Sequence, residues 1–250
     1  MPAVFVHGNP ETAAVWDLLL AELAPTRTDV VCLSPPGFGA SLPAGFEATP
    51  AGYRDWLAGE LAAFGEPVDL VGHDFGGVHV LNVVLSHPHL VRSWVSDALG
   101  VFDPDHEWHE LARRWQTPGV GEADVAARFG AAPAERAAVL VERGMGRAVA
   151  GRVAAGQGEE MGRAVLSLYR SAAAAGAPGL GLPLERAAAR PGLAVLATAD
   201  HVVGTEEQRR RAAARAGARV AVLDGLGHWW MTHEPARGAA ALAGFWACLG

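Results

Sequence analysis

Leu70-Val71-Gly72-His73-Asp74-Phe75-Gly76-Gly77 is the stretch that says most about the fold of this chain. An apolar run precedes it, and residues 78–85 have the pattern of a helix. The glycines two residues before and after Asp74 allow a sharp turn in which the strand and the helix pass close together. Asp74 would stand at the apex, where helix N–H groups and the helix dipole favour a negative charge. We interpret Asp74 as a candidate nucleophile, with an aspartate that caps a turn as the simpler alternative.

Short apolar runs recur along the chain, and their continuous hydrophobicity indicates strands that are buried on both faces. They lie at residues 4–6, 30–33, 68–71, 93–95, 193–196 and 220–223. Helical patterns lie between most of them, at residues 12–23, 53–64, 76–85, 206–216 and 235–249. This alternation predicts an α/β fold with a doubly wound, mostly parallel sheet of about six strands.

The long interval between the fourth and fifth runs predicts an inserted helical lobe. Residues 101–187 show no strand pattern and carry helical patterns at 105–115, 134–143 and 159–171. The core would then consist of residues 1–100 and 188–250. The exit from the lobe, residues 172–192, is rich in Ala, Gly and Pro and is expected to contain a flexible linker.

Composition narrows the classes of function. The 250 residues carry a formal net charge of −7 and no basic run, which argues against a nucleic-acid partner, and no apolar stretch is long enough to span a bilayer. The absence of lysine excludes Schiff-base chemistry and a P-loop lysine, and no G-x-G-x-x-G follows a strand. Neither the two cysteines nor the histidines at 106 and 109 have the spacing of a metal site. We therefore expect no cofactor or metal. We also expect a monomer or homodimer. The first residues lack a signal-sequence pattern, so we expect the protein in the cytoplasm.

Polar groups follow three other strands, in His7-Gly8-Asn9-Pro10, in Thr198-Ala199-Asp200-His201 and in Gly225-Leu226-Gly227-His228-Trp229. Ligands of an open parallel sheet bind beyond the carboxyl ends of its strands, so these groups should converge. Asp74, Asp200 and His228 then follow the chain order nucleophile, acid, histidine. Asp97, after the fourth strand, is the alternative acid.

With these residues in view, the chain resembles the α/β-hydrolase superfamily, and within it the aspartate-nucleophile branch of epoxide hydrolases and haloalkane dehalogenases. The motifs that carry the resemblance are His7-Gly8-Asn9-Pro10-Glu11 with Trp16 following, the turn around Asp74, and Gly227-His228-Trp229. The resemblance implies that the N–H groups of Asn9 and Phe75 form an oxyanion hole and that residues 101–187 form the cap of the family. It also implies that two strands usually found before the His-Gly strand are absent.

The chemistry implied by the resemblance needs no cofactor. Asp74 would attack an electrophilic carbon of a small, mainly apolar organic molecule and form an alkyl-enzyme ester. His228, oriented by Asp200, would then deprotonate a water molecule that hydrolyses the ester.

Two electrophiles remain open, and we rank epoxide opening before halide displacement. For an epoxide, Tyr169 would be the acid; the second cap tyrosine of epoxide hydrolases is replaced by Leu111, with His109 or Trp108 as substitutes. For a halide, Asn9 resembles the dehalogenase residue, but Phe75 stands where a halide-binding tryptophan is usual. The predicted pocket residues are Trp108, His109, Leu111, Trp115 and Trp229. A third alternative is a biosynthetic cyclase or isomerase, or a ligand-binding protein, on the same fold.

Overall fold

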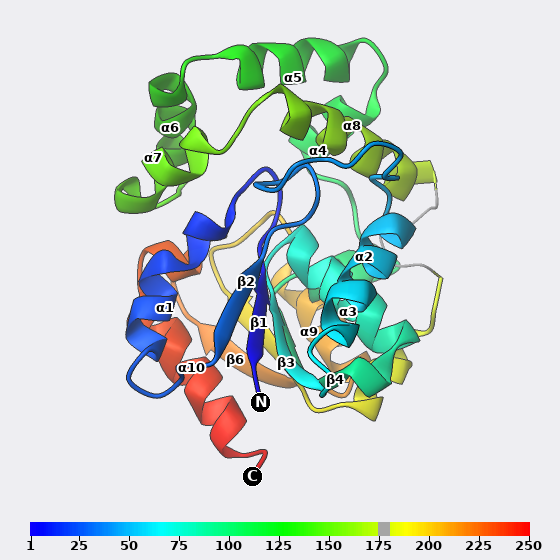
Figure 1. Cartoon of the computed structure of the whole chain (residues 1–250), viewed down its shortest axis with the longest axis vertical. Helices are drawn as coiled ribbons and strands as arrows, with labels where there is room; N and C mark the ends of the chain where they lie inside the picture. Colours follow the sequence, from blue (N-terminus) through cyan, green and yellow to red (C-terminus); the bar gives the residue numbers. More distant parts are fainter. Residues whose placement is uncertain (175–180) are drawn as a thin grey trace.

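The computed structural model describes residues 1–174 and 181–250, which are built around one parallel six-stranded sheet (Figure 1). The strands are β1 (Ala3–Val6), β2 (Val30–Leu33), β3 (Val68–Gly72), β4 (Val91–Ser96), β5 (Gly192–Ala197) and β6 (Arg219–Leu223). Their order is β2-β1-β3-β4-β5-β6, and every neighbouring pair is parallel. The predicted α/β fold and the six strands are confirmed.

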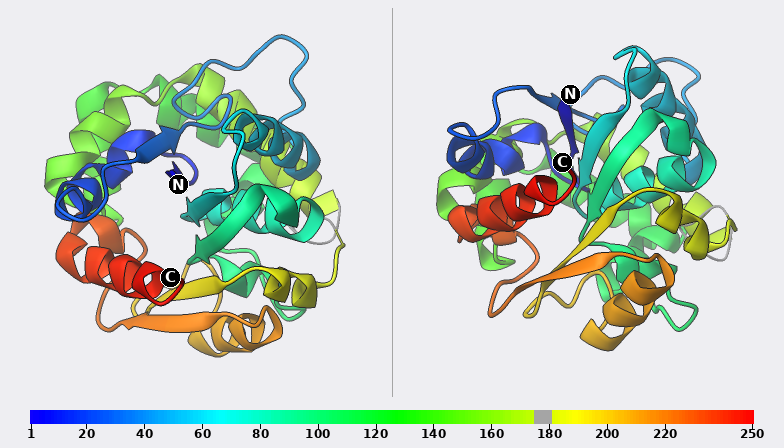
Figure 2. Two further views of the ribbon diagram at one scale, coloured as in Figure 1. Left: turned by 60° about the horizontal axis from the view of Figure 1, so that its bottom comes forward. Right: turned by 90° about the horizontal axis from the view of Figure 1, so that it is seen from below.

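Helices cover both faces of the sheet, as the views along it show (Figure 2). One face is covered by α1 (Asp17–Leu23) and α10 (Pro235–Ala247), and the other by α2 (Pro50–Ala62), α3 (Phe75–Ser86) and α9 (Glu206–Arg215). Successive strand side chains point to opposite faces, so Phe5 packs on the first side whereas Val4 and Val6 pack on the second. This double burial explains why the inner strands β1, β3, β4 and β5 read as continuous apolar runs, whereas the edge strands β2 and β6 remain partly exposed.

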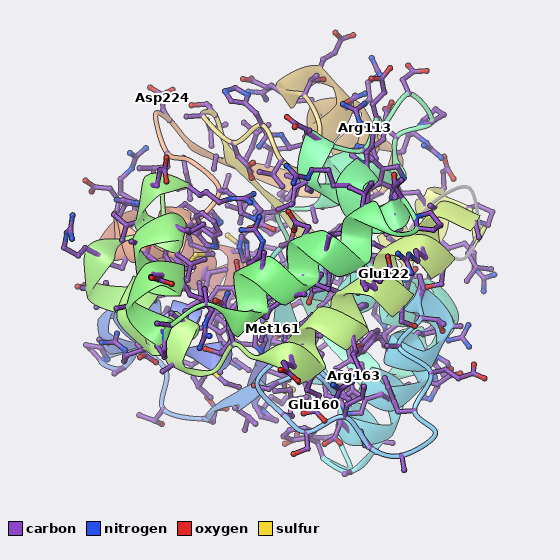
Figure 3. All side chains as sticks on the ribbon, turned by 90° about the horizontal axis from the view of Figure 1, so that it is seen from above. Arg113, Glu122, Glu160, Met161, Arg163 and Asp224 are labelled. Atoms are coloured by element: carbon purple, nitrogen blue, oxygen red, sulfur yellow. The ribbon has the colours of Figure 1, made fainter. Side chains whose placement is uncertain are left out.

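A layer of five helices lies over the carboxyl ends of the strands (Figure 1). It is formed by α4 (Glu110–Gln116), α5 (Val120–Gly130), α6 (Pro133–Glu142), α7 (Arg147–Ala155) and α8 (Glu159–Ala174), all between β4 and β5 in the chain. Seen from above, α5 and α8 run side by side, with Glu122 and Arg163 on them (Figure 3). Sequence patterns did not predict α5 and α7, whose apolar residues are few and small. The helix expected from residue 105 begins at Glu110, because the His109 side chain accepts a hydrogen bond from the Ala112 N–H and caps it there.

Short 3₁₀ helices complete the structure: η1 (Ala13–Trp16), η2 (Pro88–Leu90), η3 (Leu99–Phe102), η4 (Leu184–Ala189) and η5 (Trp230–Thr232). The single helix expected over residues 12–23 is therefore divided into η1 and α1. Within the linker expected at 172–192, residues 175–180 lie outside the described part, and η4 occupies much of the remainder. No helix in the described ranges is both long and apolar enough to cross a membrane.

Candidate active site

Asp74 occupies a strained turn between β3 and α3. Its φ of 49° and ψ of −127° are unusual for a residue with a side chain, and it is the only non-glycine residue with positive φ in residues 1–174 and 181–250. The neighbouring glycines make this turn possible: a Cβ at Gly72 would overlap the Gly76 backbone, and one at Gly76 would overlap the Val6 carbonyl. A Cβ at Gly8 would overlap the Asp74 side chain itself. The turn thus forces this carboxylate out beyond the sheet.

One backbone N–H group, that of Asn9, holds the Asp74 carboxylate on one side. Its Oδ1 accepts a hydrogen bond of 2.9 Å from the Asn9 N–H, while the N–H of Phe75, the first residue of α3, has no partner within the helix. Asp74 is 6% exposed, and this burial raises the pKa of its carboxyl, although the charge of His228 opposes the shift. Oδ1 is therefore positioned by a donor, and no hydrogen bond to Oδ2 is recorded among the described residues.

His228 connects Asp74 to Asp200. Its Nδ1 lies 3.0 Å from Asp200 Oδ2, and its Nε2 lies 3.8 Å from Asp74 Oδ2. Burial alone would lower the pKa of His228, but the Asp200 carboxylate and its hydrogen bond raise it above the ordinary value. Burial would conversely raise the pKa of Asp200, yet His228 and the Val202 N–H, 2.7 Å from Oδ1, bring it below the ordinary value. The three side chains come from segments after β3, β5 and β6, as the chain order predicted.

A second buried network lies beside these residues, and it includes Glu11, which sequence reasoning did not single out. His73 Nδ1 lies 2.6 Å from Asp97 Oδ2, and His73 Nε2 lies 3.2 Å from Glu11 Oε1. Trp229 donates its indole N–H to Glu11, and Trp230 donates to Asp97 at 2.8 Å. Trp230 is 2% exposed and belongs to the core.

In this network, the positive charge of His73 and the negative charge of Glu11 stabilise each other. Burial would lower the pKa of His73, but Asp97 and Glu11 raise it well above its ordinary value. Burial would raise the pKa of Glu11, but His73 and other donors lower it to about 2. An imidazolium thus lies between two carboxylates in the interior. The position of Glu11 directly after His-Gly-Asn-Pro was the only signal for it in the sequence.

Glu11, His73 and His228 offer ligand atoms within 4.8 Å of one another, which is close enough for a metal ion. Both ring nitrogens of His73, however, already face carboxylates, and His228 Nδ1 faces Asp200. Hydrogen bonding accounts for the arrangement, and a metal would have to displace it. The metal-free site expected from the sequence stays a prediction.

A cavity of about 370 Å³ lies between the strand ends and the helical layer. Asp74, His228, Asn9 and Tyr169 line it together with four of the predicted pocket residues, His109, Leu111, Trp115 and Trp229. Trp108 and Phe75 instead line a smaller cavity of about 20 Å³, which shares Asp74, His109 and Tyr169 with the first. Residues of α5, of α6 and of the segment after α6 that were not predicted as pocket residues also line the large cavity, among them Arg128, Arg136 and Arg143.

Tyr169 is packed into this site from α8. It is 2% exposed, and its ring centroid lies 4.9 Å from those of both Phe75 and Trp115. Within the described residues, no hydrogen bond of its hydroxyl is recorded. Burial and the charge of Asp74 raise the pKa of Tyr169 well above its ordinary value, so the phenol is neutral and keeps its O–H as a hydrogen-bond donor.

Asn9 contributes a second polar group besides its backbone. Its side-chain Nδ2 and Oδ1 are both buried, and neither has a hydrogen-bond partner in the described part of the chain. A buried amide without partners is costly, and such groups commonly await a ligand or an ordered water.

Comparisons with known proteins bear on the fold and the family of the chain. Three solved structures are similar over almost the whole chain. An E-2-(acetamidomethylene)succinate hydrolase is 19% identical with a TM-score of 0.76, and the match covers 98% of this chain and 91% of that one. The DbeA-M1 loop variant of a haloalkane dehalogenase from Bradyrhizobium elkanii is 20% identical with a TM-score of 0.68, covering 99% and 89%. CarC, a serine hydrolase of carbazole degradation, is 21% identical with a TM-score of 0.70, covering 99% and 91%.

At these identities the structural neighbours establish the fold alone, and their different reactions mean that the chemistry must be argued from the residues of this chain. A comparison with curated proteins gives no match. The sequence itself matches the family described as the alpha/beta hydrolase family over residues 3–241. The chain therefore belongs to the α/β-hydrolase family.

Proposed function

We propose that this protein is a cofactor-independent hydrolase in which Asp74 forms a covalent ester with its substrate and His228 and Asp200 drive hydrolysis of that ester. The observation that carries the proposal is that the two oxygens of the Asp74 carboxylate have different contacts. Oδ1 accepts the Asn9 N–H at 2.9 Å, and Oδ2 faces the cavity and His228 at 3.8 Å. One oxygen is thus held in place while the other is available for attack.

The first step we assign is opening of an epoxide. Oδ2 of Asp74 attacks an epoxide carbon, the C–O bond of the ring breaks, and its electron pair goes to the epoxide oxygen. Tyr169 supplies the proton for that oxygen and is left as a tyrosinate until the second step. The support for this role is the neutral, hydrogen-bond-free hydroxyl of Tyr169 in the same cavity as Asp74.

The second step releases the diol. His228 Nε2 removes a proton from water, and the oxygen of that water attacks the carbonyl carbon of the Asp74 ester. Negative charge develops on Oδ1, where the Asn9 N–H stabilises it with the Phe75 N–H; one such donor is worth about 3 kcal/mol. The ester C–O bond then breaks, the protonated His228 returns its proton to the alcohol, and the proton left on the Asp74 carboxyl passes through water to the tyrosinate, which restores both side chains. Asp200 stabilises the imidazolium between these transfers.

Halide displacement is the second candidate, and the buried amide of Asn9 favours it. Asn9 Nδ2 has no partner in the described residues and borders the cavity with Asp74, so it could donate to a departing halide. The tyrosine would then have no catalytic role. Haloalkane dehalogenases are among the structural neighbours, which is consistent with either reaction on this fold.

The helices α4 to α8 would act as the cap of this enzyme, with residues 101–187 as the unit and residues 1–100 and 188–250 as the core. They supply Tyr169, Trp115 and the apolar wall of the cavity, and they separate Asp74 from bulk water.

Turnover in heavy-oxygen water tests the covalent route. Each ester hydrolysis places one water oxygen on the Asp74 carboxyl, so repeated turnovers should leave the label in the peptide that contains Asp74. Mass spectrometry of that peptide measures the incorporated label. A diol that is labelled in the first turnover, together with an unlabelled Asp74, would contradict the proposal. Parallel assays of diol and halide release from matched epoxides and haloalkanes separate the two electrophiles.

A further inference from the structure

Arg143, at the end of α6, is a cation in the catalytic cavity without a protein partner. Its side chain lines the cavity that also contains Asp74 and Tyr169. Within residues 1–174 and 181–250, no hydrogen bond or ion pair of its guanidinium is recorded. Arg143 is exposed, so its guanidinium lies in water at the cavity and is accessible to a ligand that enters it.

The other two arginines of the cavity are accounted for. Arg128 lies 3.4 Å from Asp124, one turn before it on α5. Arg136 donates to the carbonyl oxygens of Phe129 and Ala154, at 3.2 Å each, and also to that of Ala131, so it joins the ends of α5 and α7. Arg143 alone of the three leaves its five N–H donors available to a ligand.

The electrostatic environment indicates where the Arg143 charge acts. Partial removal from water and the charge of Arg128 lower the pKa of Arg143, while Tyr169, Asp124 and Asp74 act in the opposite direction. The same positive charge helps lower the pKa of His109 to about 4, after the larger effect of burial. The Arg143 charge thus interacts with groups that line the same cavity, Tyr169 on α8 and His109 before α4.

We propose that Arg143 binds a carboxylate of the substrate, so that the natural substrates are small organic acids whose electrophilic carbon is separated from the carboxylate by an apolar segment. This inference rests on the proposed function for the electrophile, but the carboxylate site does not depend on which bond Asp74 attacks.

The chemistry of the cavity favours this class. A guanidinium binds a carboxylate through two parallel hydrogen bonds, and one cation balances one negative charge, whereas a phosphate dianion would leave charge unmatched. A carboxylate next to Asp74 would be repelled by it, so the acid group belongs at Arg143 and the reacting carbon at Asp74. Leu111, Trp115 and Leu140 offer apolar surface to the segment between them.

Binding of unreactive probes tests the site without any turnover. We expect calorimetry to show that hexanoate binds about 10- to 100-fold more tightly than hexanamide, the range expected for a hydrogen bond to a charged group. Arg143→Gln should bring this ratio close to one. Arg147→Gln is the matched control, because Arg147 is an exposed arginine of α7 outside the cavity, and it should keep the ratio of the unchanged protein.

Equal binding of the two probes by the unchanged protein, or a ratio that survives Arg143→Gln, would overturn the inference. Thermal unfolding of each variant shows whether it is folded. Arg143→Lys keeps the positive charge but loses the paired N–H donors of the guanidinium, so it should retain part of the preference for hexanoate over hexanamide. A second arm compares kcat/KM for an ω-epoxy acid and its amide, where Arg143→Gln should reduce the acid-to-amide ratio about 10-fold or more. If Asp74 takes no label but hexanoate is still preferred, the covalent mechanism fails and the Arg143 site stands.

Discussion

His73 Nδ1 lies 2.6 Å from Asp97 Oδ2, so the carboxylate that could have competed with Asp200 for the active-site histidine is engaged by another histidine. Asp97 also accepts the Asp74 N–H at 3.0 Å and the Trp230 indole at 2.8 Å. Asp97 therefore stabilises the strained turn through the Asp74 backbone N–H, whereas Asp200 contacts His228 at 3.0 Å. Asp200, the acid preferred from the sequence, and Asp97, its alternative, thus occupy different positions.

The first prediction contrasts these two acids. Asp200→Asn should lower kcat by on the order of 10⁴-fold with little change in stability, because an asparagine no longer stabilises the imidazolium or selects its tautomer. Asp97→Asn should instead lower the free energy of unfolding by about 3 kcal/mol, since it leaves His73 with an incomplete buried ion pair. Steady-state kinetics and urea unfolding of both variants measure the contrast. The reverse pattern would make Asp97 the catalytic acid.

The second prediction concerns His228→Gln. Removal of the base should block ester hydrolysis, but Asp74 should still attack. The Asn9 N–H holds Oδ1 of Asp74 without help from the imidazole, so Oδ2 remains available as the nucleophile. Mass spectrometry of the intact protein after incubation with an epoxide should show an adduct with the full mass of the epoxide; a haloalkane would add only its alkyl group. The double variant with Asp74→Asn is the control and should show no adduct. An unmodified His228→Gln protein would argue against the nucleophilic role of Asp74.

Local patterns were sufficient to predict much of this architecture. Continuous apolar runs marked all six strands, although only the four inner ones are buried on both faces, and the glycines at 72 and 76 marked the turn because any larger residue would overlap the backbone there. The convergence of Asp74, Asp200 and His228 followed from a general property of parallel sheets, whose carboxyl ends lie at one edge.

What escaped prediction depends on contacts between distant segments. Glu11 is an ordinary acid in the sequence, and its position between His73 and Trp229 arises only when segments from three parts of the chain meet. Arg143 is one of several arginines in an Ala- and Arg-rich region, and only the tertiary structure separates it from the paired Arg128. The helices α5 and α7 have short, interrupted apolar stripes, so periodicity gave no signal for them.

The third prediction concerns pH. The pKa of His228 is raised above its ordinary value of 6.5, so at a given pH more of it is protonated and unable to act as a base. The rate of ester hydrolysis should therefore increase with pH through a midpoint above 6.5. Asp74 also has a raised pKa, from an ordinary value of 3.8, but it needs only to be ionised for the first step. Between these two midpoints the ester should accumulate.

Rapid quenching and mass spectrometry across this pH range check that prediction. The fraction of covalent enzyme should fall as pH rises, while the rate of the first step stays nearly constant above the Asp74 midpoint. An ester fraction that is independent of pH would show that His228 is not the base of the second step.

The fourth prediction separates the two candidate reactions through Tyr169→Phe. Removal of the hydroxyl should lower kcat/KM for an epoxide by about 10²-fold or more, the usual contribution of a general acid. Without the phenol, the ring oxygen would have to become an unprotonated alkoxide when the C–O bond breaks. Packing should change little, because the phenyl ring keeps its contacts with Phe75 and Trp115. Asn9→Ala is the complementary variant: it keeps the backbone N–H that holds Asp74 but removes the unpartnered amide, so it should impair halide release more than diol formation. Halide release that survives Tyr169→Phe and is lost in Asn9→Ala would reverse our ranking, because the proton donor would then be dispensable and the amide would be the group that holds the leaving ion.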